Sequence, residues 1–384
     1  PEGASMPMKH RDASNVASRL RRAFTPLLLG VVFFGCGSSD NGMNASTPFQ
    51  QTNLVSDIPG MALRTDPNLV NPWGIVHGPS TPFWISDNGQ GVSTLYDGSG
   101  TPFPSPTPLV VTIPPPAGSD PGTTAAPTGI VFNATADFMV SNGTTSAAAL
   151  FIFATEDGTI SGWNQTVDVG AAILAADNSA SGAVYKGLAM ASSGGANFLY
   201  ATNFNAGTID VFDRTFAKAT LAGSFSDPNI PVGFAPFGIQ AVGTNLYITY
   251  AKQDDHKHDD VKGAGNGFVD VFDTSGHPPT RFASQGALNS PWGVALAPAN
   301  FGTFSNALLI GNFGDGRINA FDPSSHRFLG QLVDIHQSPI TISGLWGLSF
   351  GGGANAGDPN TLFFTAGLDD EAHGLFGSLQ AVSG

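Results

Sequence analysis

The sequence predicts an all-β protein folded as a six-bladed β-propeller, and three observations lead to this prediction. The same three-strand layout can be traced six times between residues 53 and 379. The residue before the glycine of each first strand falls at positions 73, 128, 186, 237, 292 and 346, so the repeat advances in steps of 55, 58, 51, 55 and 54 residues. The chain also contains 49 Gly and 28 Pro among 384 residues, with only 11% charged residues. Short strands with this period are typical of propeller blades, since solenoid repeats are usually shorter.

The clearest copy of the repeat lies between Ser290 and Pro323. Its first strand follows Pro291-Trp292-Gly293, its second strand ends at Ile310, and the glycine-rich segment 311–316 leads into the third strand. In the other copies the first strands start at residues 72, 127, 186, 236 and 345, the second strands cover 83–88, 138–142, 199–204, 246–250 and 362–365, and the third strands cover 92–97, 149–153, 208–213, 268–273 and 374–379. We expect the glycine of each first strand to lie near the propeller axis, where a side chain would clash.

The start of the propeller is predicted to close the ring. The sixth copy ends near residue 379 without a fourth strand, whereas fourth strands are visible at 109–113 and 328–333. Residues 52–56 have a strand pattern and no neighbour in sequence with which to pair. We therefore expect this strand to pair with the last blade, which would remove an open sheet edge. A short alanine-rich pattern at 171–176 predicts a turn or two of helix.

Residues 1–35 are predicted to be a signal peptide. A basic region precedes the apolar run from Ala23 to Gly35, whose 13 residues are fewer than the roughly 20 that a membrane-spanning helix needs. Cys36, the single cysteine of the chain, directly follows that run, and this arrangement resembles a bacterial lipobox. The resemblance implies that Cys36 is lipidated; the alternative is plain secretion, with Cys36 a buried or incidental cysteine. Residues 36–50 would then form a flexible tether, and residues 51–384 the propeller.

The charge of the chain argues against nucleic acid as a partner. The formal net charge is −14, and residues 1–35 contribute +3 from five basic and two acidic residues, so the mature chain carries −14 − 3 = −17. Such an acidic surface repels phosphate backbones, and it either keeps an exported protein soluble or attracts cations. With one cysteine, structural disulfides are excluded. We expect an extracytoplasmic monomer that faces the periplasm or the cell surface or is secreted, that meets a membrane only through its lipid anchor, and that binds a protein or small-molecule ligand.

Two recurring elements carry a family resemblance. The P-[WF]-G-[IV] element, as in 291–294, and the [NV]-x-[FY]-D element, as in 269–273, resemble those of NHL-type six-bladed propellers. Segments 53–57, 71–74, 250–261 and 311–316 together resemble a bacterial family of exported propellers known mainly as hypothetical proteins. The resemblance covers residues 53–379 and implies the fold and export. It implies no settled activity and no catalytic residues.

A partial ring of amide side chains is predicted on one face of the propeller. In this architecture the loops after the second strands gather around the mouth of the central channel. Four predicted second strands end on asparagine, at Asn88, Asn142, Asn203 and Asn312. Their carbonyl oxygens could coordinate a cation. The alternative is that each asparagine only caps its own turn.

The corresponding loop of the fourth unit is unusual because it is long and charged. Histidines at alternate positions of an extended segment project to the same side, and aspartates add hard oxygen ligands, so a divalent cation such as Ca²⁺ or Zn²⁺ is a candidate ligand. The last unit carries a second acidic cluster at the equivalent loop. The candidate metal ligands are Asp254, Asp255, His256, His258, Asp259, Asp369 and His373. No complete zinc or calcium motif is matched, and the alternative is a solvated charged loop.

Aromatic side chains also stand near the predicted channel entrance, at Trp73, Phe237, Trp292 and Trp346. They would form an apolar or sugar-stacking surface there, or else pack blade against blade. No nucleophile elbow, phosphate-binding loop or dinucleotide fingerprint is present. The sequence therefore favours a binding or interaction module at the cell envelope. One alternative is a metal-dependent hydrolase, such as a lactonase or esterase, in which an ion at the channel polarises a carbonyl and activates water. Another is a propeller that was once an enzyme and now only scaffolds a larger assembly.

Overall fold

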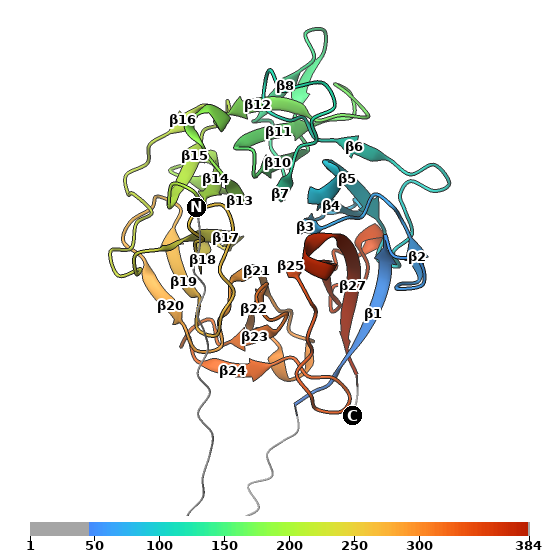
Figure 1. Ribbon diagram of the computed structural model, residues 1–384, viewed down its shortest axis with the longest axis vertical. Helices are drawn as coiled ribbons and strands as arrows, with labels where there is room; N and C mark the ends of the chain where they lie inside the picture. Colours follow the sequence, from blue (N-terminus) through green and yellow to red (C-terminus); the bar gives the residue numbers. More distant parts are fainter. Residues whose placement is uncertain (1–45, 383–384) are drawn as a thin grey trace, which may run out of the picture. The chain divides into compact units, whose positions relative to one another are not determined.

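The computed structural model describes residues 46–382. Within that range the chain forms six sheets arranged around one axis (Figure 1), which confirms the predicted six-bladed β-propeller. The signal peptide expected at 1–35, Cys36 and the tether up to residue 45 lie outside the described residues. No helix in the described range has the length and apolar character needed to cross a membrane.

The first three blades follow one another along the chain. Blade 1 contains β3 (Pro72–Val76), β4 (Phe83–Asp87), β5 (Val92–Tyr96) and β6 (Val110–Thr112). Blade 2 contains β7 (Pro127–Phe132), β10 (Phe151–Thr155), β11 (Thr159–Trp163) and β12 (Ile173–Asp177). Blade 3 contains β13 (Tyr185–Ser193), β14 (Ala196–Asn203), β15 (Thr208–Phe212) and β16 (Lys218–Ala219). In each blade the strands pair in this order, antiparallel, from the axis outwards.

The other three blades have the same order. Blade 4 contains β17 (Phe234–Val242), β18 (Asn245–Lys252), β19 (Phe268–Asp273) and β20 (Thr280–Ser284). Blade 5 contains β21 (Pro291–Leu296), β22 (Leu308–Asn312), β23 (Ile318–Phe321) and β24 (Phe328–Gln331). Blade 6 contains β25 (Leu345–Phe350), β26 (Leu362–Gly367), β27 (His373–Ala381) and β1 (Phe49–Ser56), with the short β2 (Arg64–Thr65) paired parallel to β1. The helical turns are η1 (Asn88–Gln90), η2 (Ser179–Ser181), η3 (Gly302–Phe304), η4 (Ala354–Ala356) and α1 (Leu368–Glu371).

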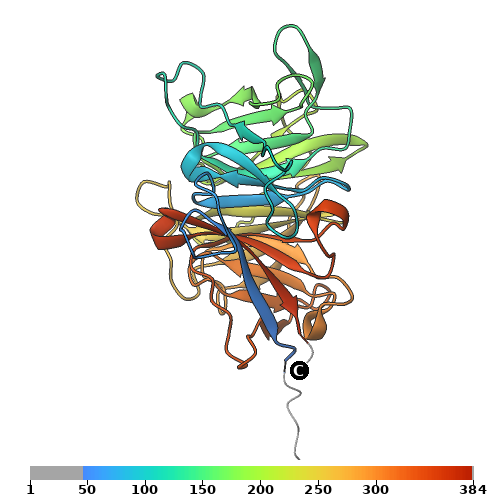
Figure 2. The ribbon, with the colours of Figure 1, turned by 90° about the vertical axis from the view of Figure 1, so that its right-hand side faces the viewer.

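The ring closes as the sequence predicted, with β1 as the fourth strand of blade 6. β1 pairs antiparallel with β27, from Phe49 opposite Ala381 to Ser56 opposite Leu375. Figure 2 shows this blue strand lying along the red C-terminal strand. The strand starts at Phe49, two residues before the expected domain boundary, because the Phe49 ring is buried 4.6 Å from the ring of Phe301.

The inner strands meet around the axis, and glycine is needed where they do. β3, β7, β13, β17, β21 and β25 each contact the next, and β25 contacts β3. A Cβ added at Gly238 would lie 2.2 Å from the carbonyl oxygen of Trp292, and one at Gly293 would lie 2.4 Å from that of Trp346. Such distances are far below van der Waals contact, so any side chain would force the inner strands apart. The structure therefore confirms the predicted role of the first-strand glycines.

Blade 2 differs from the prediction in which segments form its second and third strands. Segment 138–142, expected as the second strand, contains β8 (Met139–Ser141), which pairs only with β9 (Ser146–Ala148) in a separate hairpin. The second and third strands are β10 and β11 instead. All five residues of β10 are buried, whereas two of the three residues of β8 are exposed, so the more apolar segment takes the central place in the blade.

The helix expected at 171–176 is also absent from the structure, since residues 173–177 form β12. β12 pairs with the outer edge of β11, from Thr159 opposite Asp177 to Gly162 opposite Ile173. An open strand edge offers backbone hydrogen bonds that outweigh the modest helix preference of alanine.

Candidate functional site at the channel mouth

One face of the propeller collects the loops that follow the second strands and those that precede the first strands. In blade 1, Pro72 pairs opposite Asp87, so the first strand begins and the second strand ends at the same face. We call this face the channel mouth. The residues that come together there, the mouth cluster, are Asn71, Asn88, Glu156, Lys186, His258, Asp259 and Glu371.

Two asparagines, Asn71 and Asn88, link two glutamates that belong to different blades. Asn71 Nδ2 donates a hydrogen bond to Glu371 Oε2 at 2.7 Å and another to Asn88 Oδ1 at 3.2 Å. Asn88 Nδ2 in turn donates to Glu156 Oε2 at 2.8 Å. The two amides therefore hold Glu371 and Glu156 in fixed positions on the same side of the mouth.

A buried lysine continues this network across the axis. Lys186, the second residue of β13, is 2% exposed, and its Nζ donates to Glu156 Oε1 and, at 3.2 Å, to Asp259 Oδ1. The ammonium also lies 5.2 Å from the ring centroid of Trp73, a cation–π distance. Burial alone would lower the pKa of Lys186, but the negative charges of Glu156 and Asp259 outweigh it and raise the pKa above its ordinary value. Lys186 is therefore held as a cation and is unsuited to act as a nucleophilic amine.

Glu371 lies on a turn with an unusual backbone. Asp369, Asp370 and Glu371 have φ angles of 50°, 51° and 70°, in the left-handed region that non-glycine residues rarely adopt. Each such residue costs on the order of 1 kcal/mol, and such backbone tends to occur at functional sites. Burial raises the pKa of Glu371, and the neighbouring charge of Glu156 adds to this effect, while the hydrogen bond from Asn71 opposes it. The structure thus holds a second carboxylate close to Glu156 at a cost in both backbone and electrostatic energy.

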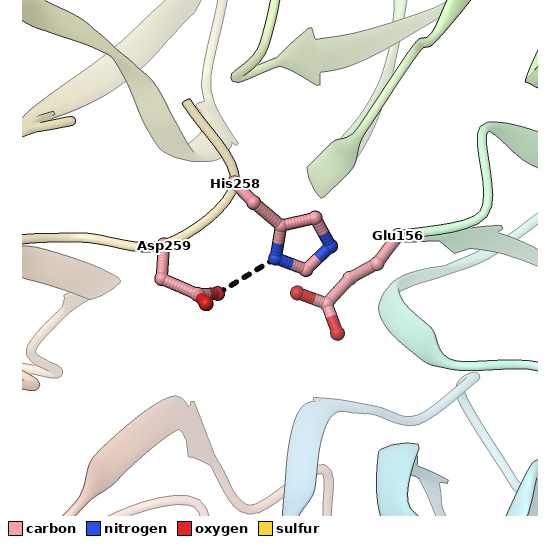
Figure 3. Close-up of side chains that lie close together, drawn as sticks. All are labelled: Glu156, His258 and Asp259. Atoms are coloured by element: carbon pink, nitrogen blue, oxygen red, sulfur yellow. Dashed lines mark hydrogen bonds and ion pairs between the residues drawn. The ribbon is translucent and has the colours of Figure 1, made fainter. Parts of the chain in front are cut away.

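The long loop after β18 brings His258 and Asp259 over the mouth. His258 Nδ1 lies 2.9 Å from Asp259 Oδ1, and the hydrogen bond with Asp259 raises the pKa of His258. Figure 3 shows Glu156 reaching toward the same imidazole from the other side. One ligand atom from each of Glu156, His258 and Asp259 lies within 4.8 Å of the others, a spacing that could hold a metal ion. However, the ammonium of Lys186 already bonds both carboxylates, which reduces their attraction for a second cation.

The other predicted metal ligands lie apart from this group. Within residues 46–382, only the Glu156, His258 and Asp259 set meets the spacing needed for an ion. Asp254 accepts hydrogen bonds from the backbone of His258 and Asp259 and shapes the loop, while Asp255, His256 and Asp369 are exposed. His373 Nδ1 lies 2.7 Å from Asp57 Oδ2, next to the junction of β27 with β1. The two acidic loops do share one face, but they do not form one ligand set.

The asparagine ring is incomplete. Asn142 lies in the β8–β9 hairpin, where its side chain donates to the carbonyl of Val167, because the blade 2 register differs from the prediction. Asn203 donates to Asp210 Oδ2, and Asn312 donates to Asp315 Oδ1, three residues further along its own turn. These two asparagines therefore support their own blades, and Asn88 alone of the four joins the mouth cluster.

The aromatic residues form a plug below the mouth. Trp73 and Trp346 stack at 3.5 Å, Phe313 stacks on Trp346 at 3.8 Å, and Trp292 meets Trp73 edge-on at 5.9 Å. Phe237 packs 5.8 Å from Trp346, and every ring in this set is at most 9% exposed. Trp346 Nε1 donates to Asn71 Oδ1, so the plug also supports the mouth cluster. The rings offer no open stacking surface at the mouth, because they pack on one another across the axis.

Glu156, Lys186, Glu371 and Asn71 were not among the predicted site residues. A signal for Glu156 exists, since Asp157-Gly158 between two apolar segments is a strong hairpin turn signal. Lys186 stands where the other five repeats have an aromatic residue or threonine, and a lysine at such a position is itself unusual. Glu371 belongs to the acidic cluster of the last unit, of which only Asp369 and His373 were named as candidate ligands. Asn71 is identified by its contact with Glu371, 300 residues away in sequence.

Comparisons with known proteins identify viral relatives. The chain is 34% identical over 343 residues to "Uncharacterized protein R648" of Acanthamoeba polyphaga mimivirus, which covers 87% of this chain and 81% of the viral protein. It is also 34% identical over 333 residues to "Uncharacterized protein L690" of the same virus, covering 85% and 84%. No family model matches the chain. The resemblance to a bacterial family is corrected by these matches, since the relatives found are viral.

Among solved structures, the chain is similar to virginiamycin B lyase from Staphylococcus aureus, with a TM-score of 0.50 and 16% identity over 87% of this chain and 99% of the lyase. A likeness at this level of identity shows the fold alone. It supports the propeller fold that the repeated elements indicated.

Proposed function

The chain belongs to the family of the mimivirus proteins R648 and L690. From the geometry of the mouth we propose that it is a ligand-binding module that takes a cationic amine group at the channel mouth. The observation that carries the proposal is Glu371. Within residues 46–382, no lysine, arginine or histidine lies within ion-pair distance of this carboxylate.

The charges of the mouth cluster support a cationic ligand. Lys186 pairs with Glu156 and Asp259, which leaves Glu371 as a part-buried carboxylate without a cation of its own. A ligand ammonium placed beside Glu371 would relieve the repulsion between Glu371 and Glu156. The strained turn and the hydrogen bond from Asn71 hold the acceptor in place before the ligand arrives, which lowers the entropy cost of binding.

We expect an amine to bind where neutral and anionic molecules of the same length do not. Isothermal titration calorimetry with 1,4-diaminobutane, butane-1,4-diol and succinate tests this directly. A charge-assisted hydrogen bond contributes about 1.5–3 kcal/mol, so the Glu371→Gln variant should bind the diamine roughly 10- to 100-fold more weakly. Asp369→Asn removes the same charge from an exposed site on the same turn and should change the affinity by less than about twofold. Equal binding of the diamine and the diol, or equal losses in both variants, would refute the proposal.

The same titration should depend on pH in a defined direction. Because the pKa of Glu371 is raised above its ordinary 4.5, the carboxylate is charged only above that raised value. The affinity for the diamine should therefore increase with pH through this range and level off once Glu371 is ionised, while the amine itself stays protonated to about pH 10. In Glu371→Gln this increase should disappear.

A metal-dependent hydrolase is the second candidate, and the grouping of Glu156, His258 and Asp259 favours it. A divalent ion there could act as a Lewis acid toward a carbonyl. This candidate requires the ion to displace Lys186 from Glu156 or Asp259, which costs the buried ammonium its partners. The diamine titration separates the two candidates if it is repeated with Zn²⁺ or Ca²⁺: a metal site predicts that either ion competes with the diamine and that His258→Ala abolishes the competition.

Export and lipid attachment form a separate part of the proposal. They rest on the basic and apolar pattern of residues 1–35 and on the position of Cys36. We expect the mature protein to begin at Cys36 and to carry acyl chains, so intact-mass measurement should give a lipidated species that Cys36→Ser converts to an unmodified one. An unmodified mature wild-type protein would contradict lipid attachment and leave the mouth site unaffected.

A further inference from the structure

The face opposite the mouth contains a cavity, which we call the axial funnel. It has a volume of about 620 Å³ and is lined by the C-terminal ends of all six inner strands. A narrower continuation toward the mouth is lined by four of the first-strand glycines and by Trp292. There the aromatic plug begins, so the funnel ends blindly and does not connect with the mouth cluster.

The lining of the funnel contrasts with the mouth in its charge. None of its residues is Asp, Glu, Lys or Arg, although the chain as a whole has 44 such residues (15 Lys and Arg plus 29 Asp and Glu). Aliphatic side chains, one from each of five blades, surround its deep end: Ile75, Ile130, Leu188, Val294 and Leu348. Near the rim lie Phe132, Met190, Leu296 and Phe350, and Leu296 is 45% exposed. An ion entering this space would lose its hydration without meeting a countercharge, which costs several kcal/mol.

Hydrogen-bonding capacity in the funnel comes from neutral groups. Each of the six inner strands is the edge strand of its sheet. The backbone amides and carbonyls on one side of each inner strand are therefore not paired with another strand. Polar side chains in the lining are those of His77, Gln240 and Ser349, and Gln240 borders both the wide and the narrow parts of the cavity. The ring nitrogens of His77 lie 3.0 Å from the carbonyl oxygen of Gly78 and 3.1 Å from that of Phe350. Backbone amides and a carboxamide can bond an uncharged ligand at both its donors and its acceptors.

From these observations we propose that the axial funnel is a second binding site, separate from the mouth, for an uncharged small molecule with an apolar body and one or two neutral hydrogen-bonding groups. The volume lies within the range of roughly 300–1,000 Å³ in which proteins enclose small ligands. Flexible Met190 at the rim can adapt to the shape of the ligand. The proposal is independent of the amine site, because the aromatic plug lies between the funnel and the mouth cluster.

The test uses three probes of equal size and different charge: 2-naphthalenemethanol, 2-naphthoate and 2-naphthylmethylamine. Saturation-transfer NMR and crystal soaking with the full-length protein should show that the neutral alcohol binds in the funnel and that naphthoate does not. Because naphthylmethylamine can also bind at the mouth, it is measured in Glu371→Gln, where we expect no binding in the funnel. Binding of all three probes with similar affinity, or density for the alcohol elsewhere, would overturn the proposal.

An isosteric variant changes the charge of the funnel without changing its shape. Gln240→Glu places one carboxylate in the lining at an exposed position of β17. In the Glu371→Gln background, this variant should weaken the binding of the neutral alcohol severalfold. It should also allow naphthylmethylamine to bind in the funnel. Gln380→Glu makes the same substitution at an exposed position of β27 outside the funnel. It should leave the affinities for both probes equal to those of the Glu371→Gln protein. If Gln240→Glu behaves like Gln380→Glu, the funnel is not the site.

Discussion

A protein that begins at Gly60 should lose most of the stability of a protein that begins at Ser46. The longer protein retains β1, whose side chains Phe49, Leu54 and Val55 are at most 5% exposed. Burial of side chains of this size stabilises by about 1.5–3 kcal/mol each, and their sum approaches the whole free energy of unfolding of an average domain, about 5–15 kcal/mol. The truncation also exposes the edge of β27 along its pairing with β1. Thermal unfolding monitored by circular dichroism measures the difference.

A peptide added in trans distinguishes ring closure from a general loss of contacts. Residues 46–59 as a synthetic peptide should restore the melting temperature of the truncated protein toward that of the longer one, because the strand can still pair with β27. A peptide carrying Val55→Asp should fail, since it would place a charge at a position that is 0% exposed. An unchanged melting temperature after truncation would mean that β1 does not hold the ring closed.

The architecture could be predicted from sequence because its signals are local and repeated. Each first-strand glycine is required by the approach of one inner strand to the next, so the requirement recurs in every blade and marks the period. Ring closure could be predicted for a similar reason, since the residues of β1 have a strand pattern and the sixth unit has no fourth strand of its own.

The register of blade 2 could not be predicted in this way. The strand β8 and the following Asn142 look like a second strand and its turn, and only the pairing of β10 with β7 shows which segment lies inside the blade. This single shift hid Glu156, because the prediction places residue 156 after the third strand (149–153), whereas in the structure it lies in the turn between the second and third strands, β10 and β11. The choice between the two segments depends on burial against neighbouring blades, which sequence spacing does not contain.

The mouth cluster shows the same limit. His258, Asp259 and Asn88 were predicted because each belongs to a recognisable loop. Their partners were missed, because Lys186 lies inside an inner strand and was read as part of the repeat. A buried charge is recognised by its partner in space, and Glu156 and Lys186 are 30 residues apart in different blades.

Lys186→Met should destabilise the protein far more than Asp259→Asn. Glu156 is 13% exposed and Asp259 is 68% exposed, so removal of the ammonium leaves Glu156 buried without a countercharge. Breaking a buried pair from one side costs about 3–5 kcal/mol, whereas an exposed pair contributes at most about 1 kcal/mol. Urea unfolding of the two variants measures both values. Similar losses of unfolding free energy in the two variants would mean that the buried Lys186–Glu156 pair contributes no more to stability than the exposed Lys186–Asp259 pair.

The double variant Lys186→Met with Glu156→Leu separates a structural role of this pair from a functional one. Replacing both members of a buried ion pair with apolar residues is often neutral or stabilising, so the double variant should recover most of the stability lost in Lys186→Met. If the pair serves only the fold, the double variant should also bind 1,4-diaminobutane as the wild type does. We expect instead that it folds and binds the diamine at least about tenfold more weakly, because Glu156 and Asn88 would no longer hold the mouth cluster together. Lys186 stands at a position where the other repeats have mostly aromatic residues. A double variant that is stable but binds the diamine weakly would show that this lysine is kept for binding and not for folding.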